Sequence, residues 1–365
     1  MSTSPEYKLR THEVRKTYGP VIALAGASIE MREGEFLTLL GPSGSGKTTL
    51  LMAIAGLNDP DSGEIWIDGK LATYLPPHQR DLGMVFQNYA LFPHMTIREN
   101  IAFPLRMRKR TEAEIRDAVG RVLDTVRLPG VEDRLPRELS GGQQQRIALA
   151  RCFVYEPSII LMDEPLGALD KKLRDALQRE IKHLHENLGI TVLYVTHDQE
   201  EAMVMSDRIC LMNQGEIEQL GTPDDLYFRP RTLFAADFLG ESNLLAGTVD
   251  DADAESTTVL RPDGTRLRGL PNATLTRGAR VRLMVRPENV VVAGGGDEEN
   301  AVEGVLKEVI MSGQITKWFI ELPDGSEMVS TRLTHGSPKA RSGERMRFAW
   351  STACGVVLAD DGSIT

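Results

Sequence analysis

The amino-acid sequence predicts an α/β domain with a mostly parallel sheet, followed by a small all-β domain. Four short apolar runs, at residues 36–40, 82–86, 158–162 and 191–195, have the length of buried parallel strands, and each is followed by polar residues. Segments with helical periodicity lie between them. After about residue 238 the pattern changes to short β-like runs separated by turn residues. A chain of 365 residues with 41% hydrophobic residues is large enough for two or three domains.

Charge and cysteine usage narrow the classes of function. The chain has 42 basic and 52 acidic residues and a net charge of −10, which argues against a general nucleic-acid surface; the basic cluster 106–110 is interpreted as a solvated face. No apolar stretch approaches the roughly 20 residues that span a bilayer, and residues 1–6 lack signal-peptide character, so the chain is expected in the cytosol. Cys152, Cys210 and Cys354 fit no metal-ligand spacing and are expected to be small apolar residues.

The first segment, residues 7–29, alternates loosely between apolar and polar residues and carries turn residues at 18–20. This pattern predicts an antiparallel sheet, to which residues 62–69 add a further short strand. Tyr18 lies at the first turn. An aromatic ring there could stack on the flat ring of a ligand, or it could be a core or edge aromatic, and the residues alone leave both interpretations open.

A glycine-rich loop lies between the apolar run 36–40 and the helix-compatible run 50–55. Its residues are Gly41, Pro42, Ser43, Gly44, Ser45, Gly46, Lys47, Thr48 and Thr49. This order of strand, loop and helix matches the P-loop pattern, in which backbone N–H groups and a helix N-terminus hold phosphates. Lys47 would reach the β- and γ-phosphates, and Thr48 would offer a hydroxyl to Mg²⁺. A glycine-rich turn with a solvated lysine is the alternative, and the flanking elements favour the nucleotide site.

The next part of the chain predicts an inserted helical segment. The second apolar run ends in the polar Gln87, and residues 88–93 carry aromatic side chains that either pack in the core or face a partner. Thr111 and Glu114 form a capping box, and helical periodicity continues to Val126.

A second glycine motif precedes a helix-compatible stretch at residues 144–155. It consists of Leu139, Ser140, Gly141, Gly142 and Gln143. A Ser-Gly-Gly before a helix is either a plain N-cap after a turn or a second anion-binding helix terminus. The motif is far from Lys47 in the sequence, so proximity along the chain does not make it part of the same phosphate site.

The apolar run 158–162 ends abruptly in Asp163 and Glu164. Adjacent carboxylates at the end of a buried strand are unfavourable unless a cation pairs with them. Asp163 would hold Mg²⁺, and Glu164, turned the other way by strand alternation, could take a proton from an attacking water. A surface acidic turn is the alternative.

The strand at 191–195 follows the charged helix 171–188 and is followed by His197. A lone histidine is usually structural, but the position of this one favours a functional role. The carboxyl ends of parallel strands meet at one edge of a sheet, where ligands bind. We therefore expect the phosphate loop, Gln87, the two carboxylates and His197 to lie together.

Taken together, these motifs resemble the ATP-binding subunit of an ABC (ATP-binding cassette) transporter over about residues 7–235. The resemblance implies ATP and Mg²⁺ as cofactors and catalytic roles for Lys47, Gln87, Glu164 and His197. By the resemblance, Tyr18 is the adenine-stacking A-loop tyrosine, Gly41 to Thr49 form the Walker A loop, and Gln87 is the Q-loop residue that senses Mg²⁺. Leu139 to Gln143 form the family signature, Asp163 is the Walker B aspartate, and Glu164 is the catalytic glutamate. Asp170 is the D-loop aspartate, and His197 is the switch histidine.

The resemblance also implies partners. Two chains would sandwich two ATPs head to tail, with Ser140 to Gln143 of one chain capping the ATP on the Walker A loop of the other. The expected assembly is a homodimer beneath two separate membrane-spanning permease subunits, which would dock near Gln87 and the aromatic segment 89–92, and a solute-binding protein would take part only indirectly. The expected location is peripheral, on the cytoplasmic face of the inner membrane, with no nucleic-acid partner.

The C-terminal third has β-like runs and two Pro-Asp-Gly turns that are typical of a small barrel. The runs are 245–249, 281–285, 302–306 and 317–320, and the turns are 262–264 and 323–325. With the fragment Val285 to Glu288, this part resembles the TOBE extension of importer ATPases, which implies a structural, subunit-contact or regulatory role.

The sequence therefore predicts an ABC ATP-binding domain at residues 1–237, with a helical subdomain at about 90–157, and an OB-like or TOBE-like barrel at 238–365. Residues 227–245 look most like the polyamine (spermidine/putrescine) branch, although importers of iron(III), sugars and other small solutes have similar layouts. A soluble ABC ATPase acting on nucleic acid or ribosomes is the alternative from another class of function. A long coiled-coil insertion or a second cassette would favour it, and the sequence shows neither. A small-molecule kinase would have no use for the second glycine motif.

Overall fold

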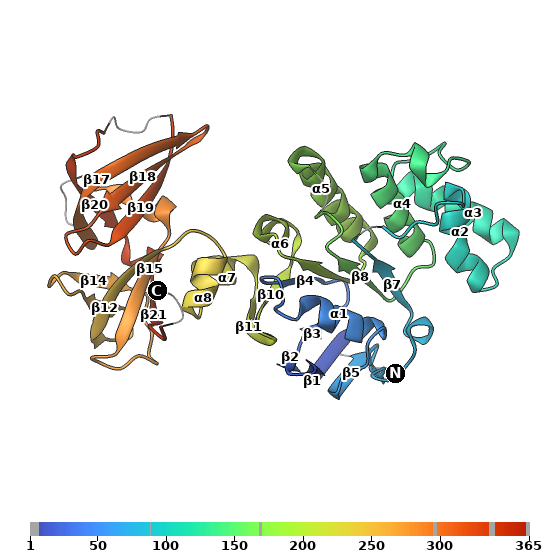
Figure 1. Cartoon of the computed structure of the whole chain (residues 1–365), viewed down its shortest axis with the longest axis horizontal. Helices are drawn as coiled ribbons and strands as arrows, with labels where there is room; N and C mark the ends of the chain where they lie inside the picture. Colours follow the sequence, from blue (N-terminus) through green and yellow to red (C-terminus); the bar gives the residue numbers. More distant parts are fainter. Residues whose placement is uncertain (1–6, 88, 168–169, 295–297, 336–339, 363–365) are drawn as a thin grey trace. The chain divides into compact units, whose positions relative to one another are not determined.

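A computed structural model describes residues 7–87, 89–167, 170–294, 298–335 and 340–362. Residues 1–6 and Asn88, which are discussed above, lie outside this part, as do Ala168 and Leu169 just before Asp170. The described chain forms two compact units that divide between Pro223 and Asp224 (Figure 1). No described helix is long and apolar enough to cross a membrane.

A six-stranded sheet forms the centre of the first unit. Its order is β11 (Glu216–Gly221), β10 (Arg208–Asn213), β4 (Phe36–Leu40), β9 (Val192–Thr196), β8 (Ile159–Asp163) and β7 (Leu82–Val85). Every neighbouring pair is parallel except the pair of β10 and β11. The four predicted apolar strands are therefore adjacent, and their carboxyl ends share one edge, as the sequence predicted.

Side-chain alternation on these strands builds two separate cores. Phe36, Met162 and Tyr194 face one cluster, whereas Leu37 and Leu161 face the other. Strands buried on both faces need apolar residues at successive positions, which is why the sequence shows continuous apolar runs.

The second core cluster is covered by an antiparallel sheet and by the helix that follows the phosphate loop, α1 (Lys47–Ala55). The sheet consists of β1 (Leu9–Tyr18), β2 (Val21–Ala27), β3 (Glu30–Met31), β5 (Ser62–Ile67) and β6 (Lys70–Leu71). This arrangement confirms the antiparallel subdomain predicted from residues 7–29 and 62–69. A short 3₁₀ helix, η1 (Pro77–Gln79), precedes β7.

The first core cluster is covered by helices (Figure 1). They are α2 (Ile97–Met107), α3 (Glu112–Thr125), η2 (Pro136–Glu138), α4 (Gly141–Phe153), α5 (Lys171–Leu188) and α6 (Gln199–Met205). Thr111 and Glu114 form the predicted capping box of α3. Helix α4 begins three residues before the predicted start at residue 144, because Ser140 is its N-cap and the two glycines form its first turn.

The second unit is mostly β-structure, as predicted. After α7 (Pro223–Phe228) and α8 (Leu233–Phe238), β14 (Arg266–Gly269), β13 (Thr257–Leu260), β12 (Asn243–Ala252), β15 (Arg280–Val285) and β21 (Gly355–Ala359) form one antiparallel sheet. The other contains β16 (Val291–Val292), β20 (Arg345–Trp350), β17 (Asn300–Ser312), β18 (Ile315–Glu321) and β19 (Glu327–Leu333), with η3 (Pro287–Asn289) and η4 (Thr352–Cys354) between strands. Both sheets contribute to one core, and the Pro-Asp-Gly turns join β13 to β14 and β18 to β19 as predicted.

Arg286 ties the segment before β12 to the second unit. Its fully buried guanidinium donates hydrogen bonds to the carbonyls of Tyr227, Ala236 and Gly240, at 2.9 Å each, and to the Ser242 hydroxyl at 2.6 Å. These bonds explain why the compact units divide at residue 223. The domain boundary at residues 237 and 238 stays a prediction.

Candidate nucleotide site

The phosphate loop joins β4 to α1 in a conformation that requires glycine. Gly46, the N-cap residue of α1, has φ +100°, and a Cβ there would lie 2.4 Å from the carbonyl oxygen of Ala23. No side chain caps the first turn of α1. Its backbone N–H groups therefore have no side-chain acceptor, which is the arrangement that binds phosphate at a helix N-terminus.

Lys47 reaches back across this loop. Its Nζ donates hydrogen bonds to the carbonyls of Gly41 and Pro42, both at 2.8 Å. Burial lowers the pKa of Lys47, and the nearby carboxylates of Glu164 and Asp163 oppose this effect. The ammonium group of Lys47 thus lies inside the loop, and the carboxylates of Glu164 and Asp163 are close enough to stabilise its positive charge.

Thr48 and Asp163 form a pair of oxygen donors beside the loop. The Thr48 hydroxyl donates to Asp163 Oδ1 at 3.3 Å. Burial raises the pKa of Asp163, and the negative charge of Glu164 raises it further. The hydrogen bond from Thr48 and the positive charge of Lys47 lower this pKa but do not cancel the effect of burial. A bound cation would relieve the unfavourable charge on Asp163.

These donors fit Mg²⁺. Magnesium prefers hard oxygen ligands and is usually held by one or two carboxylates together with substrate phosphates and waters. Among the described residues there is no cluster of three or more His, Cys, Asp or Glu side chains that could hold a metal alone. Thr48 and Asp163 therefore suit a metal that arrives with a phosphate ligand.

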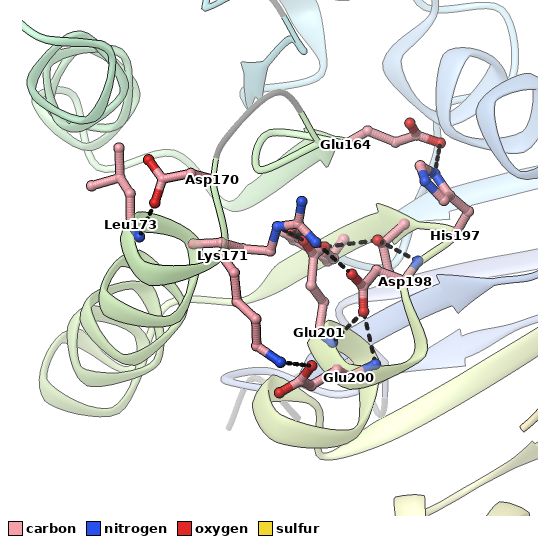
Figure 2. Close-up of polar contacts among 11 residues, drawn as sticks. Glu164, Asp170, Lys171, Leu173, His197, Asp198, Glu200 and Glu201 are labelled. Atoms are coloured by element: carbon pink, nitrogen blue, oxygen red, sulfur yellow. Dashed lines mark hydrogen bonds and ion pairs between the residues drawn. The ribbon is translucent and has the colours of Figure 1, made fainter. Parts of the chain in front are cut away.

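Glu164 and His197 face each other at the same edge (Figure 2). Glu164 Oε1 lies 3.2 Å from His197 Nδ1. The backbone of Glu164 is left-handed, with φ +43°, and its N–H donates to the Val195 carbonyl at 3.0 Å. Strand alternation was the predicted cause of its direction, but β8 ends at Asp163, so the left-handed turn directs the side chain.

Gln87 joins this group. A Cβ on Gly167 would lie 3.8 Å from Gln87 Nε2 and 4.0 Å from Glu164 Oε2, so the amide and the carboxylate lie close to the same point. The structure thus brings together the phosphate loop, Gln87, Asp163, Glu164 and His197, as the parallel-sheet argument predicted.

The remaining predicted site residues lie on other elements. Tyr18 ends β1 with a half-exposed ring, and its hydroxyl accepts a hydrogen bond from Asn58 Nδ2. Ser140 and Gln143 form a capping box at the exposed start of α4, with Ser140 N–H donating to Gln143 Oε1 at 2.9 Å. Asp170 is the exposed N-cap of α5 and accepts from the Leu173 N–H at 3.1 Å.

The aromatic segment after Gln87 is only partly exposed. Tyr89 and Leu91 pack against the helical core, and the Phe92 ring lies 4.8 Å from that of Phe103. Packing in the core and exposure to a partner therefore both apply in part, because the side chains of this segment contact the core without being fully covered.

Sequence reasoning missed two arginines near the site. Arg151 of α4 donates to the carbonyls of Tyr89 and Ala90 at 2.9 and 2.8 Å, and Arg174 of α5 pairs with Asp198 at 2.8 Å. Both lie inside helices with ordinary charged patterns. Their only signal in the sequence is a position close to a recognised motif.

A phosphate loop, an adjacent hydroxyl and carboxylate pair and a second carboxylate on one edge of a parallel sheet define a P-loop NTPase. The match to known proteins gives the family. Residues 24–167 match the ABC transporter model and residues 283–358 match the TOBE domain model. The chain belongs to the ABC transporter ATP-binding family and is an ABC-type ATPase, which confirms the resemblance found in the sequence.

Curated relatives align over nearly the whole chain. The spermidine/putrescine import ATP-binding protein PotA of Rubrobacter xylanophilus is 44% identical over 96% of this chain and 93% of its own length. PotA of Methylococcus capsulatus is 45% identical over 95% of this chain and 91% of its own. An ATP-binding cassette solved as a dimer in a post-hydrolysis state with ADP and Pi is 36% identical, with a TM-score of 0.53, over 59% of this chain and 98% of its own.

Proposed function

We propose that this ATPase powers an ABC importer of polyamines. The shared sheet edge that gathers Lys47, Asp163, Glu164 and His197 carries the ATPase part of the proposal. The substrate class is supported by relatives named for spermidine and putrescine import, whose similarity continues through the C-terminal domain. An importer of iron(III), a sugar or another small solute is the alternative.

Mg-ATP would bind at this edge. The half-exposed ring of Tyr18 would stack on adenine, residues 41–49 would hold the phosphates, and Thr48, Asp163 and Gln87 would hold Mg²⁺. Bound Mg²⁺ neutralises charge on the β- and γ-phosphate oxygens.

The residues of this chain would then position and deprotonate the attacking water. Glu164 would accept the proton, because its carboxylate lies at the strand end next to the phosphate loop. His197, which is 3.2 Å from that carboxylate, would hold it in place and contact the γ-phosphate. The ammonium of Lys47 would stabilise the charge that builds up on the phosphoryl oxygens.

The active assembly would be a dimer. The first turn of α4, at Ser140, Gly141, Gly142 and Gln143, would be an anion-binding terminus that caps the ATP of a second copy. Ser140 and Gly141 are exposed there, whereas Gly142 is buried. The exposed Asp170 would belong to the same composite site. The related cassette solved as a dimer with ADP and Pi supports this arrangement.

We place the dimer under two separate permease subunits, on the cytoplasmic side of the membrane, with a solute-binding protein delivering the solute. The partly covered segment 89–92 beside Gln87 is the proposed docking surface for the permease. The ATPase domain would comprise residues 1–237, with its helical subdomain at about 90–157, and the TOBE-like domain residues 238–365. The latter would have a structural or regulatory role.

Glu164→Gln tests the hydrolytic part. The amide keeps the shape of the side chain but accepts no proton, so Mg-ATP binding should persist while hydrolysis falls about 10²–10⁴-fold. Dimers should accumulate with ATP in size-exclusion chromatography. Glu200→Gln, the same change at an exposed carboxylate on α6, is the control and should leave hydrolysis unchanged. Unchanged turnover in Glu164→Gln would remove the general-base assignment.

Transport tests the substrate. The complex with its permease and solute-binding protein, in proteoliposomes, should take up spermidine and putrescine when ATP is inside, and Glu164→Gln should abolish this uptake. Uptake of iron(III) or a sugar without any uptake of polyamine would overturn the substrate proposal and leave the ATPase proposal standing. Failure of membrane subunits to copurify would favour a soluble ABC ATPase.

A further inference from the structure

Helix α5 and the loop that carries His197 are joined by a charged hydrogen bond. Arg174 Nη1 donates to Asp198 Oδ2 at 2.8 Å, and Asp198 directly follows His197 (Figure 2). Arg174 lies in the first turns of α5, whose N-cap is Asp170. The contact therefore connects the predicted D-loop helix to the predicted switch histidine.

Asp198 also fixes the loop from its other side. Its Oδ1 accepts hydrogen bonds from the N–H groups of Glu200 and Glu201 at 2.8 and 3.2 Å, which caps α6. Its own N–H donates to Thr196 Oγ1 at 3.0 Å. The backbone on both sides of His197 is thus held by bonds that pass through Asp198.

Behind Asp198 lies a buried acid. Glu201 is 2% exposed and accepts hydrogen bonds from the Tyr194 and Thr196 hydroxyls at 2.8 and 2.7 Å. Arg174 Nε lies 3.9 Å from Glu201 Oε1. The guanidinium therefore lies between two carboxylates of the His197 loop and helix α6, and its planar fork can serve both.

A second ion pair joins the same two helices without this burial. Lys171 Nζ lies 3.6 Å from Glu200 Oε2, with side chains that are 76% and 60% exposed, against 28% and 25% for Arg174 and Asp198. Exposed pairs contribute little because water and salt screen them, whereas partly buried, hydrogen-bonded pairs hold a geometry. The chain thus offers a matched internal control.

We propose that Arg174 is a positioning residue for hydrolysis. By holding Asp198, it keeps the His197 ring against the Glu164 carboxylate and makes that contact depend on the first turns of α5. The inference rests on the proposed roles of Glu164 and His197. The contacts described for Arg174 are with Asp198 and Glu201, so we infer that its effect reaches the reaction through the placement of His197.

The test compares steady-state ATP hydrolysis by the full-length protein and its variants. Arg174→Ala should lower kcat by about 10- to 100-fold, since small displacements of a catalytic group have effects of this order, while KM for ATP changes less than about twofold. Arg174→Lys keeps the charge but not the fork and should restore only part of the rate. Lys171→Ala should match the wild type.

A double-mutant cycle separates positioning from general destabilisation. If Arg174 acts through His197, then Arg174→Ala should lower kcat by less than about twofold in a His197→Ala background. A full additional loss there, or a wild-type kcat in Arg174→Ala, would overturn the inference. Undiminished hydrolysis in His197→Ala alone would instead overturn the proposed role of His197.

Asp198→Asn keeps the question answerable if Arg174→Ala does not fold. Asparagine is a good N-cap, so it preserves the start of α6 while removing the charge that Arg174 holds. A loss of kcat with unchanged KM in this variant supports the inference, and a wild-type kcat contradicts it.

Discussion

Replacing Gly46 by alanine should destabilise the first unit far more than the same change at Gly44. Both residues are left-handed, with φ +100° and +81°. A Cβ at Gly46 would lie 2.4 Å from the Ala23 carbonyl oxygen and 3.1 Å from Leu24 Cδ2, whereas a Cβ at Gly44 has no atom within 4 Å. Only the backbone strain is common to the two substitutions, so the pair isolates the steric term.

The magnitudes follow from these contacts. A left-handed alanine costs about 1–2 kcal/mol, so Gly44→Ala should lower the free energy of unfolding by that amount. At Gly46 the neighbour is backbone and cannot rotate away, which adds about 1–3 kcal/mol for overpacking. The expected loss for Gly46→Ala is therefore about 2–5 kcal/mol.

Urea unfolding of both variants without nucleotide is the appropriate assay, because it excludes any clash between the new methyl group and a phosphate. Midpoint shifts should be compared at constant m-value. Equal destabilisation of the two variants would refute the reasoning, since the loop would then not be fixed against β2 as described.

Two further predictions concern buried charge. Burial raises the pKa of Asp163 above its ordinary value of 3.8, so ionisation of this carboxyl lowers the stability of the folded protein as pH rises past that value. Asp163→Asn should therefore raise the Tm at pH 7 and bring no gain below about pH 3.8. The same variant should lose Mg²⁺-dependent hydrolysis. Arg286→Met removes the donor of hydrogen bonds to the carbonyls of Tyr227, Ala236 and Gly240 and should lower the stability of the second unit by about 3 kcal/mol in urea unfolding. Lys307→Met, at an exposed pair with Glu321, should cost less than about 1 kcal/mol.

The sequence predicted the sheet edge because elementary rules act locally there. Continuous apolar runs mark strands buried on both faces, and parallel strands must end together. That rule places Glu164 and His197 at one edge although they are far apart in the sequence, and the left-handed turn at Glu164 directs its side chain. Helix α3 was predicted for a similar reason, since Thr111 and Glu114 act within a single turn.

Contacts between helices and strands were harder to predict from the sequence. Arg174 is one of several charged residues on α5, and nothing in the helical pattern distinguishes it from Lys171. The partner of Arg174, Asp198, is nevertheless partly buried, whereas the partner of Lys171, Glu200, is exposed. The left-handed turn at Glu164 was missed as well, because a glutamate carries no signal for positive φ. Such features depend on which elements pack together.

The segment after Gln87 illustrates how strongly such contacts decide local structure. Tyr89 and Ala90 are consecutive left-handed residues, with φ +59° and +47°, at a cost of order 1–3 kcal/mol each. Arg151 of α4 offsets this strain with a charged hydrogen bond to each carbonyl, and such bonds contribute about 1.5–3 kcal/mol each. Helix α4 thus holds the conformation beside Gln87 near its C-terminal end and carries Ser140 at its N-terminus. A displacement of α4 would therefore move both Ser140 and the segment beside Gln87.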